Sequence, residues 1–173
     1  METVQCTRCA TDYVRQSRRS GTIDRILSML RMSPFRCQLC THRFWVMRLG
    51  RDFGETPNDD KREYQRFAVD IPVTLQGEQQ SGKGRITTLA IRGCCLETEF
   101  RLEHGARVSL TMPLPGLHPP VEIETAVVRA ALGKRFGLEF LEIDSLDDER
   151  LRSHIEALIV TGPGELRKMY LNL

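Results

Sequence analysis

The chain has 173 residues, 40% of them hydrophobic and 28% charged, with 13 Gly and 8 Pro, and this balance excludes disordered and fibrous proteins. No apolar run reaches the roughly 18 residues of a membrane span, and Met1–Gln5 begins no hydrophobic signal segment, so we expect a cytoplasmic protein without a membrane span. The net charge of +2 conceals an asymmetry. Residues 1–51 contain ten Arg and three acids, whereas the rest contains fifteen basic and twenty acidic residues, which indicates two parts with different partners.

Two Cys-x-x-Cys pairs lie in the basic segment, Cys6 with Cys9 and Cys37 with Cys40. Each pair places two thiolates on one side of a tight turn, and two such turns close a tetrahedral site around one Zn(II). Four thiolates leave no open position for water, so the predicted zinc is structural. Unligated thiols or a redox-active pair are the alternatives. His42 is expected at the surface or beside the site, because four cysteines already complete it.

A short helix is expected between the two cysteine pairs. The pattern over residues 21–32 is helical, with Thr22 as the capping residue. The apolar residues at helical spacing are Ile23, Ile26, Leu27 and Leu30. This helix accounts for the wide gap between the two pairs.

The end of the basic segment predicts a strand and then a linker. Residues 41–48 have the pattern of a strand, and Phe44 and Trp45 are expected to supply a small apolar core. A zinc-ribbon-like module is therefore predicted over residues 1–48. Residues 49–61 are polar, contain Gly and Pro and show no sustained period, which is typical of a linker.

Short strands with a period of two follow the linker. Apolar residues alternate with others over residues 67–75, and Pro72 in this run indicates an edge or a bulge. The same period recurs over residues 108–112, 121–127 and 136–140. Short alternating strands separated by Gly and Pro predict an antiparallel barrel or sandwich.

One helix is expected after the strands. Ser145 and Asp148 have the spacing of a capping box. The residues on its apolar face are Leu151, Ile155, Leu158 and Ile159. This face is predicted to cover an open end of the barrel.

Three motifs in the second part carry a resemblance to a known family. Arg62-x-x-x-Arg66 precedes the first strand, a segment with Gly93 follows, and Phe136-Gly-x-x-Phe140 comes near the last strand. In these motifs and their order the chain resembles the PilZ family of small β-barrels. The resemblance implies a mainly β protein, with an antiparallel PilZ-like barrel and C-terminal helix over residues 62–160, a tail over 161–173, and the zinc ribbon in front.

The resemblance also implies a ligand. In the PilZ family an Arg-x-x-x-Arg motif and an Asp/Asn-x-Ser-x-x-Gly motif bind the bacterial messenger cyclic di-GMP. By resemblance, Arg62 and Arg66 are the clamps, and a guanidinium suits both the phosphates and the guanines of this ligand. Gly93 matches the second motif and is expected to supply the turn between two strands, whereas Thr88 replaces Asp/Asn and Ala90 replaces Ser. The loss of one or two ligand hydrogen bonds at these positions weakens binding by about 1 to 3 kcal/mol.

Two other functions remain open from the sequence. The departures at Thr88 and Ala90 are compatible with a ligand-free adaptor that binds a protein partner. The basic zinc module is compatible with a nucleic-acid contact, since guanidinium groups bind phosphates. The arginines in question are Arg15, Arg18, Arg19, Arg25, Arg31, Arg36, Arg43 and Arg48.

No catalytic pattern accompanies the remaining reactive side chains. His104, His118 and His154 have no nucleophile or carboxylate at a diagnostic spacing, so we expect a protein that is not an enzyme. Cys94 and Cys95 are adjacent on an extended segment, and their side chains therefore point to opposite faces. We expect one to be a core thiol and the other a surface thiol.

Overall fold

The computed structural model describes residues 4–18, 21–47, 63–77 and 81–161. The chain divides into two compact units, Met1–Gln65 and Arg66–Leu173, which are described separately. The predicted linker over residues 49–61 lies outside the described residues, as do Arg62 and the tail beyond residue 161.

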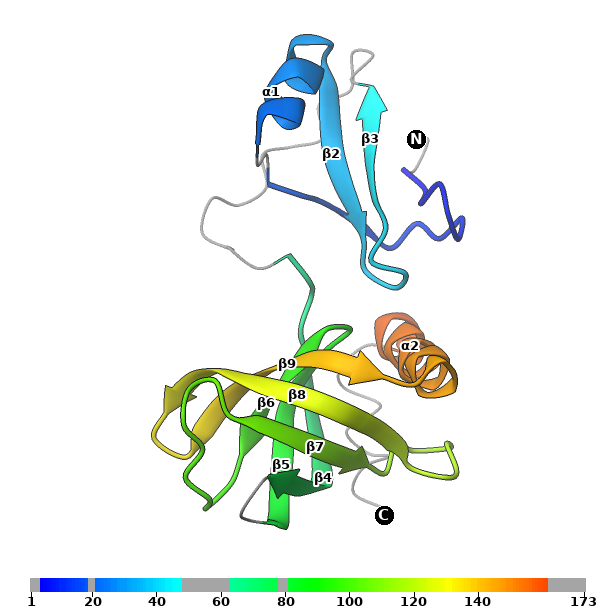
Figure 1. Cartoon of the computed structure of the whole chain (residues 1–173). Coiled ribbons are helices and arrows are strands. Elements are labelled where there is room, and N and C mark those ends of the chain that lie inside the picture. Colours follow the sequence, from blue (N-terminus) through cyan, green and yellow to red (C-terminus); the bar gives the residue numbers. More distant parts are fainter. Residues whose placement is uncertain (1–3, 19–20, 48–62, 78–80, 162–173) are drawn as a thin grey trace. The chain divides into compact units, whose positions relative to one another are not determined.

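The first unit is a small antiparallel sheet with one helix (Figure 1). Its elements are β1 (Val14–Gln16), α1 (Thr22–Met29), β2 (Met32–Cys37) and β3 (Arg43–Met47), and the strands are ordered β1-β2-β3. Phe35 on β2 pairs with Phe44 on β3, and their buried rings lie 6.1 Å apart. The strand and core residue expected near Phe44 are therefore present, while Trp45 is only half-buried.

Helix α1 turns an acid inward and its apolar residues outward. The carboxylate of Asp24, which is 3% exposed, accepts hydrogen bonds from Arg43 at 2.7 Å and from the indole N–H of Trp45 at 3.1 Å. The exposed apolar residues are Ile23, Ile26, Met29 and Leu30. The expected Thr22 cap is wrong, because Gly21 with φ 98° is the N-cap residue and no side chain caps the helix.

The second unit is a closed barrel of six antiparallel strands (Figure 1). The strands are β4 (Phe67–Gly77), β5 (Ser81–Ala90), β6 (Gly93–Glu97), β7 (Arg107–Met112), β8 (Val121–Leu132) and β9 (Arg135–Ile143). They close in the order β4-β5-β6-β9-β8-β7. The mainly β fold class is confirmed, and of the two architectures that the strands allowed, the barrel is the one formed.

Alternating residues of each strand fill the barrel, as the period of two predicts. The largest completely buried strand residues are Ile71, Leu75, Ile86, Leu89, Leu96, Leu110, Met112, Val121 and Ile123. Pro72 is exposed, follows a register shift between Ala68 and Ile71, and precedes the first β4–β7 pair at Thr74. Pro72 itself pairs in register with Arg85 of β5, so the bulge lies just before it, and Pro72 stands where β4 is not yet paired with β7 and no ladder hydrogen bond to β7 is lost.

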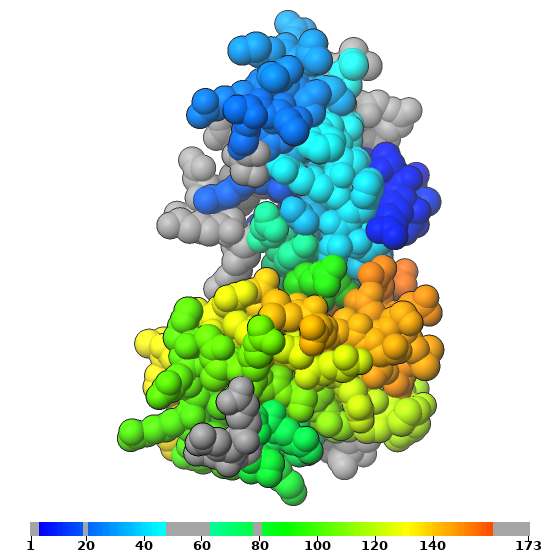
Figure 2. Space-filling view, viewed as in Figure 1, coloured from blue at the N-terminus to red at the C-terminus, as the bar shows by residue number. Residues whose placement is uncertain are grey.

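The helix α2 (Ser145–Thr161) packs against β8, and the two adjoin at the barrel surface (Figure 2). Leu151, Ile155 and Leu158 are buried on its inner face, as predicted. The capping box is wrong: the carboxylate of Asp144 accepts the Leu146 N–H at 2.8 Å, one residue earlier than expected. Among the described residues, no helix combines the length and the apolar character needed to cross a membrane.

Candidate zinc centre and ligand surface

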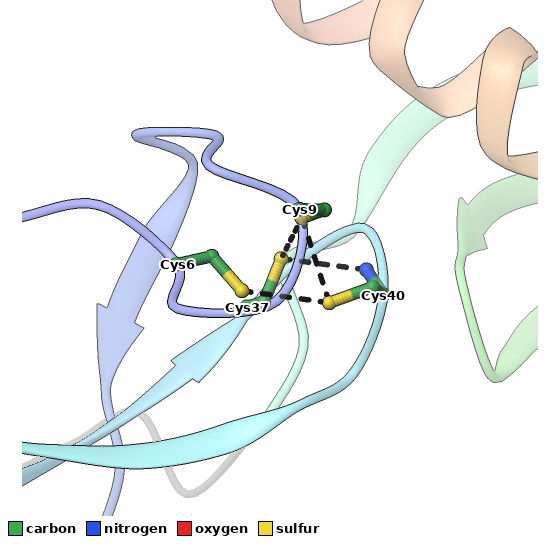
Figure 3. A group of neighbouring side chains, drawn as sticks. All are labelled: Cys6, Cys9, Cys37 and Cys40. Carbon is green, nitrogen blue, oxygen red and sulfur yellow. Dashed lines mark hydrogen bonds between the residues drawn. The ribbon is translucent and has the colours of Figure 1, made fainter.

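The four cysteines of the first unit come together, with their sulfurs facing one another (Figure 3). The Sγ atoms of Cys6, Cys9, Cys37 and Cys40 all lie within 4.8 Å of one another. The distance to Cys40 is 3.5 Å from both Cys6 and Cys9, and the Cys9–Cys37 distance is 3.6 Å. Tetrahedral zinc with Zn–S bonds of about 2.3 Å requires sulfurs about 3.8 Å apart. The cluster therefore has the size and the soft donor set of a zinc tetrathiolate site.

Both cysteine pairs are built into turns of the same form. The backbone N–H two residues after the first cysteine, on Arg8 and on Leu39, lies 3.4 Å from that cysteine's sulfur. The residue after each pair, Ala10 and Thr41, has a positive φ of 57° and 60°. This left-handed residue reverses the chain, and the inward N–H groups offset the negative charge of a thiolate.

In the metal-free thiols, burial raises the pKa and hydrogen bonds from these amides lower it. Burial raises the pKa of the Cys37 thiol to about 12. Burial also opposes ionisation of Cys6, but N–H groups of Arg8 and Cys9 and the thiol of Cys40 stabilise its thiolate, and its pKa falls to about 7. Because metals bind thiolates, loading this site releases protons.

His42 lies outside the sulfur cluster, as expected. Its ring stacks on Phe44, with the centroids 6.1 Å apart and the planes within 7°. The imidazole thus supports the small apolar core beside the second cysteine turn.

The second cysteine turn also holds the segment that leads into the barrel. The side-chain amide of Gln38, which is 5% exposed, accepts a hydrogen bond from the Gln65 N–H at 2.7 Å. Its Nε2 donates to the carbonyl oxygens of Glu63, at 3.3 Å, and Arg36, at 3.2 Å. Gln38 was not among the expected functional residues, and its place between Cys37 and Cys40 was the only signal in the sequence.

Arg36 contacts the side chains of the same segment. The guanidinium donates to the Tyr64 hydroxyl at 3.1 Å and lies 5.6 Å from the centre of the Tyr64 ring. It also forms an ion pair with Glu63 at 3.5 Å and donates to the carbonyl of Thr41 at 3.3 Å. Residues 63–65, which the sequence assigned to the barrel domain, therefore belong to the first unit.

Arg66 stands at the entry of the barrel, directly before β4. Its neighbour Phe67 pairs with Leu89 on β5, and Ala90 pairs with Gly93 across the β5–β6 turn. The exposed Arg66 also lies near enough to the buried Cys94 for its charge to act on that thiol. The topology therefore brings Arg66 and the second motif to one end of β4 and β5, while Arg62 lies outside the described residues.

The two departures from the second motif are turned away from solvent. The Thr88 hydroxyl is buried and has no hydrogen-bond partner among the described residues. Ala90 is 5% exposed. Compared with an Asp/Asn and a Ser, these positions offer a ligand little polar surface.

Gly93 is required for close packing, which differs from the turn role predicted for it. It is the first residue of β6, and the turn itself consists of Ile91 and Arg92. A Cβ at position 93 would lie 2.2 Å from the carbonyl oxygen of Leu138 on β9. Only glycine allows β6 and β9 to approach this closely here.

The adjacent cysteines of β6 face opposite sides, as predicted. Cys94 is 1% exposed, and burial raises the pKa of its thiol far above the ordinary range. Cys95 is half-buried, and its sulfur lies 4.0 Å from the Arg135 guanidinium. The pair is one core thiol and one partly exposed thiol.

Arg92, in the turn between β5 and β6, lies among acidic residues. It is exposed and lines a hollow of about 470 Å³ whose other polar residues are Glu124, Glu142, Ser145 and Asp148. Three of these four are acids, so this hollow disfavours a ligand with two phosphates.

The arginines of the first unit are not one uniform surface. Arg36 and Arg43 are engaged within the unit, with Glu63 and Asp24 respectively. Arg18, Arg25 and Arg31 are exposed. The charge of this unit is therefore in part a structural requirement of its own fold.

Comparison with known proteins identifies the second unit. The PilZ domain family matches residues 60–157. No curated protein matches the chain. Among solved structures, the PilZ domain of CeSA from a cellulose-synthesizing bacterium is similar at 18% identity and a TM-score of 0.44, over 56% of this chain and 98% of that chain. The Bacillus subtilis inhibitor of motility (MotI/DgrA) is similar at 18% identity and a TM-score of 0.49, over 75% of this chain and 74% of that chain.

The family match spans more than half of the chain and contains the whole barrel and most of α2. PilZ domains are non-catalytic receptor and adaptor domains, and the absence of enzymatic activity in this chain stays a prediction. The cysteine cluster lies in front of the matched residues. With its closed barrel, its Arg66 at the barrel entry and this match, the chain belongs to the PilZ family.

Proposed function

We propose that this protein is a cytoplasmic regulator whose PilZ domain binds cyclic di-GMP and whose N-terminal unit holds one structural Zn(II). The observation that carries the ligand proposal is the placement of Arg66, exposed at the start of β4 and beside the β5–β6 turn, in a member of the PilZ family. Arg62, four residues earlier, is the second clamp.

The chemistry of the messenger explains why arginine is needed. Cyclic di-GMP presents two phosphates and two guanines, and a guanidinium can form forked hydrogen bonds to phosphate oxygens or to the O6 and N7 atoms of guanine. Closing Arg62 and Arg66 over the ligand would also restrict the chain that joins the two units. Binding would in this way change the state of the connection as well as the barrel.

The zinc proposal rests on the sulfur cluster. Cys6, Cys9, Cys37 and Cys40 supply four soft ligands at a spacing that fits Zn(II), and this donor set leaves no site for water. The metal would stabilise a unit that has few large buried side chains, and the residues would take no part in chemistry.

Calorimetric titration with cyclic di-GMP tests the ligand proposal directly. Arg66→Ala is expected to weaken binding at least about tenfold, since it removes a charged hydrogen-bond donor. Arg107→Ala is the matched control, because Arg107 is an exposed arginine beside Gly77, at the opposite end of β4. Equal binding by the wild type and Arg66→Ala would place the ligand elsewhere.

The second motif explains why weak binding is expected. Thr88 and Ala90 present little polar surface, so affinity should lie below that of PilZ domains with the complete motif. The double variant Thr88→Asp with Ala90→Ser restores the family residues and is expected to tighten binding. Titration of this variant beside the wild type separates a weakened site from an absent one.

A ligand-free protein adaptor is the second candidate function, and the burial of Thr88 Oγ1 and Ala90 favours it. Under this function neither the wild type nor the restored variant would give heat or a spectral shift with saturating cyclic di-GMP. No comparison supports a nucleic-acid partner, and none is proposed.

A further inference from the structure

We propose that Gln38, inside the second zinc-binding turn, is a positioning residue for Arg66 and thereby couples zinc binding to messenger binding. The proposal rests on the proposed function, because the quantity it changes is the affinity for cyclic di-GMP. Its core is a contact between two segments far apart in the sequence, the turn Cys37–Cys40 and residues 63–65.

The contact is directed at the backbone. Gln38 accepts from the N–H of Gln65 at 2.7 Å and donates to the carbonyl of Glu63 at 3.3 Å. One buried amide therefore sets the path of the chain on both sides of Tyr64. These two hydrogen bonds do not involve the side chains of Glu63 and Gln65.

These residues are the centre of the arginine motif. The three positions between Arg62 and Arg66 are Glu63, Tyr64 and Gln65. Arg36 holds the first two through an ion pair and a hydroxyl contact, and Gln38 holds the first and the third. Arg36 and Gln38 together thus contact every residue between the two proposed clamps.

Arg66 follows directly on the residue that Gln38 holds. The N–H of Gln65 is bonded to the side chain of Gln38 in the cysteine turn. Adjacent Cα atoms are about 3.8 Å apart, so a fixed Gln65 restricts the path by which the chain enters Arg66. A side chain on a fixed backbone loses less entropy when it binds a ligand.

The position of Gln38 depends on the metal ligands around it. It lies between Cys37 and Cys40, and its own N–H donates to the carbonyl of Tyr13 at 2.9 Å. In so small a unit, the turn keeps its form only when the four sulfurs are held together. Zinc that orders the turn also orders Gln38, and through it the chain before Arg66.

Linkage makes this coupling measurable from either ligand. If zinc raises the affinity for cyclic di-GMP by some factor, cyclic di-GMP must raise the affinity for zinc by the same factor. Couplings of this kind commonly amount to between about 5-fold and 150-fold. A residue that only stabilises the first unit would lower zinc affinity without producing this reciprocity.

The experiment compares the zinc-loaded full chain with Gln38→Met, which keeps the side-chain volume and removes both hydrogen-bonding atoms. Gln16→Met is the matched control, because Gln16 lies in β1 outside both zinc-binding turns. Gln38→Met is expected to retain one zinc, to bind cyclic di-GMP at least about fivefold more weakly, and to lose the effect of cyclic di-GMP on zinc competition with a chelator. Gln16→Met should match the wild type in all three.

Hydrogen exchange of the Gln65 amide separates failure of this inference from failure of the proposed function. We expect that amide to be protected in the zinc-loaded wild type and exchanging freely in Gln38→Met. Messenger binding that is equal in the wild type and Gln38→Met overturns the inference and leaves the proposed function standing. An unprotected Gln65 amide in the wild type overturns it as well. A protected amide in a wild type that binds no cyclic di-GMP supports the Gln38 contact and overturns the function.

Discussion

Buried polar side chains differ in how well their hydrogen-bonding groups are satisfied. The Gln38 amide has three backbone partners, one that donates to its oxygen and two that accept from its nitrogen, so both N–H donors are used. The Thr88 hydroxyl has none among the described residues. An unpaired buried hydroxyl costs about 1 to 3 kcal/mol, so Thr88 lowers the free energy of unfolding of the barrel.

His154 should make the barrel less stable in acid. Burial lowers the pKa of this side chain, which is 5% exposed, to about 4 from its ordinary value of about 6.5. Between these values the unfolded chain takes up a proton that the folded chain does not, so the free energy of unfolding falls as the pH falls from about 6.5 to about 4. The loss is on the order of 3 kcal/mol.

Denaturant unfolding at several pH values measures this loss. His154→Gln removes the titrating group, and its stability should change less than that of the wild type over the same range. His104→Gln is the control, because it replaces an exposed histidine of the same unit. If His154→Gln and the wild type lose stability in parallel, another group is responsible.

At the scale of elements, two close contacts decide how helices and strands pack. The contact of Asp24 with Arg43 joins α1 to β3, and Ile23, Ile26 and Met29 of that helix are exposed. The absence of a side chain at Gly93 lets β6 approach β9. Neither contact follows from a periodic pattern, because in each the partners come from different elements.

Replacement of Asp24 should loosen the first unit. Asp24→Asn removes the charge that neutralises Arg43, whose side chain is 23% exposed, and should cost about 2 kcal/mol. Amide exchange over β3 in the zinc-loaded protein measures the change. The matched variant is Asp12→Asn, since Asp12 is an exposed acid of the same unit. Equal protection in the two variants would show that the Asp24 ion pair does not hold α1.

Addition of one methyl group at Gly93 should destabilise the barrel. In Gly93→Ala the new Cβ would meet the Leu138 carbonyl at 2.2 Å, so a strand must shift, at a cost of about 2 kcal/mol or more. Gly137→Ala is the matched control, because its Cβ would lie 3.4 Å from the Ala130 Cβ. Thermal melting should separate the two variants, and similar melting temperatures would argue against a close β6–β9 contact.

At the scale of the whole molecule, the two units depend on different forces. The barrel has a core drawn from every strand and from α2. The first unit has a few buried side chains and a cluster of four thiols. A unit of this size generally needs a metal or a disulfide to remain folded.

Metal removal should therefore affect the two units unequally. Purified protein is expected to contain about one zinc per chain, and a strong chelator should remove protection from the amides of the first unit while sparing the barrel. Cys37→Ser should lose the metal, whereas Cys95→Ser should retain it because Cys95 lies in β6. Loss of zinc without a change in amide exchange would contradict a structural role for the metal.

A fragment that begins near Asp60 should fold without the first unit. It contains all six strands of the barrel and α2, and its core residues come from these elements. A cooperative melt close to that of the full chain is the expected result. A molten fragment would show that the barrel depends on the first unit.

Local patterns were sufficient to predict β3, β4, β7, β8, β9, the two helices and the family, whereas β1, β2 and β5 were not predicted. The period of two over residues 67–75 follows from the alternation of strand side chains, and the helical face of Leu151, Ile155 and Leu158 follows from the geometry of a helix. The two Cys-x-x-Cys pairs predicted a common cluster, because each pair carries its own turn. The PilZ motifs stand in order along one stretch of chain, so the family was readable from them.

Contacts between distant residues decided the rest. Gln38 lies 27 positions from the Gln65 amide that it holds, and Asp24 lies 19 positions from Arg43. No short window contains both partners, so the inward orientation of Asp24 and the contacts of Gln38 could not be predicted from local patterns. Gly93 was expected to be important for a turn, but its role is to allow close packing, because the carbonyl that excludes a side chain comes from β9. A sequence specifies what each segment tends to become, whereas the closing of the sheet and the gathering of the thiols decide which side chains meet.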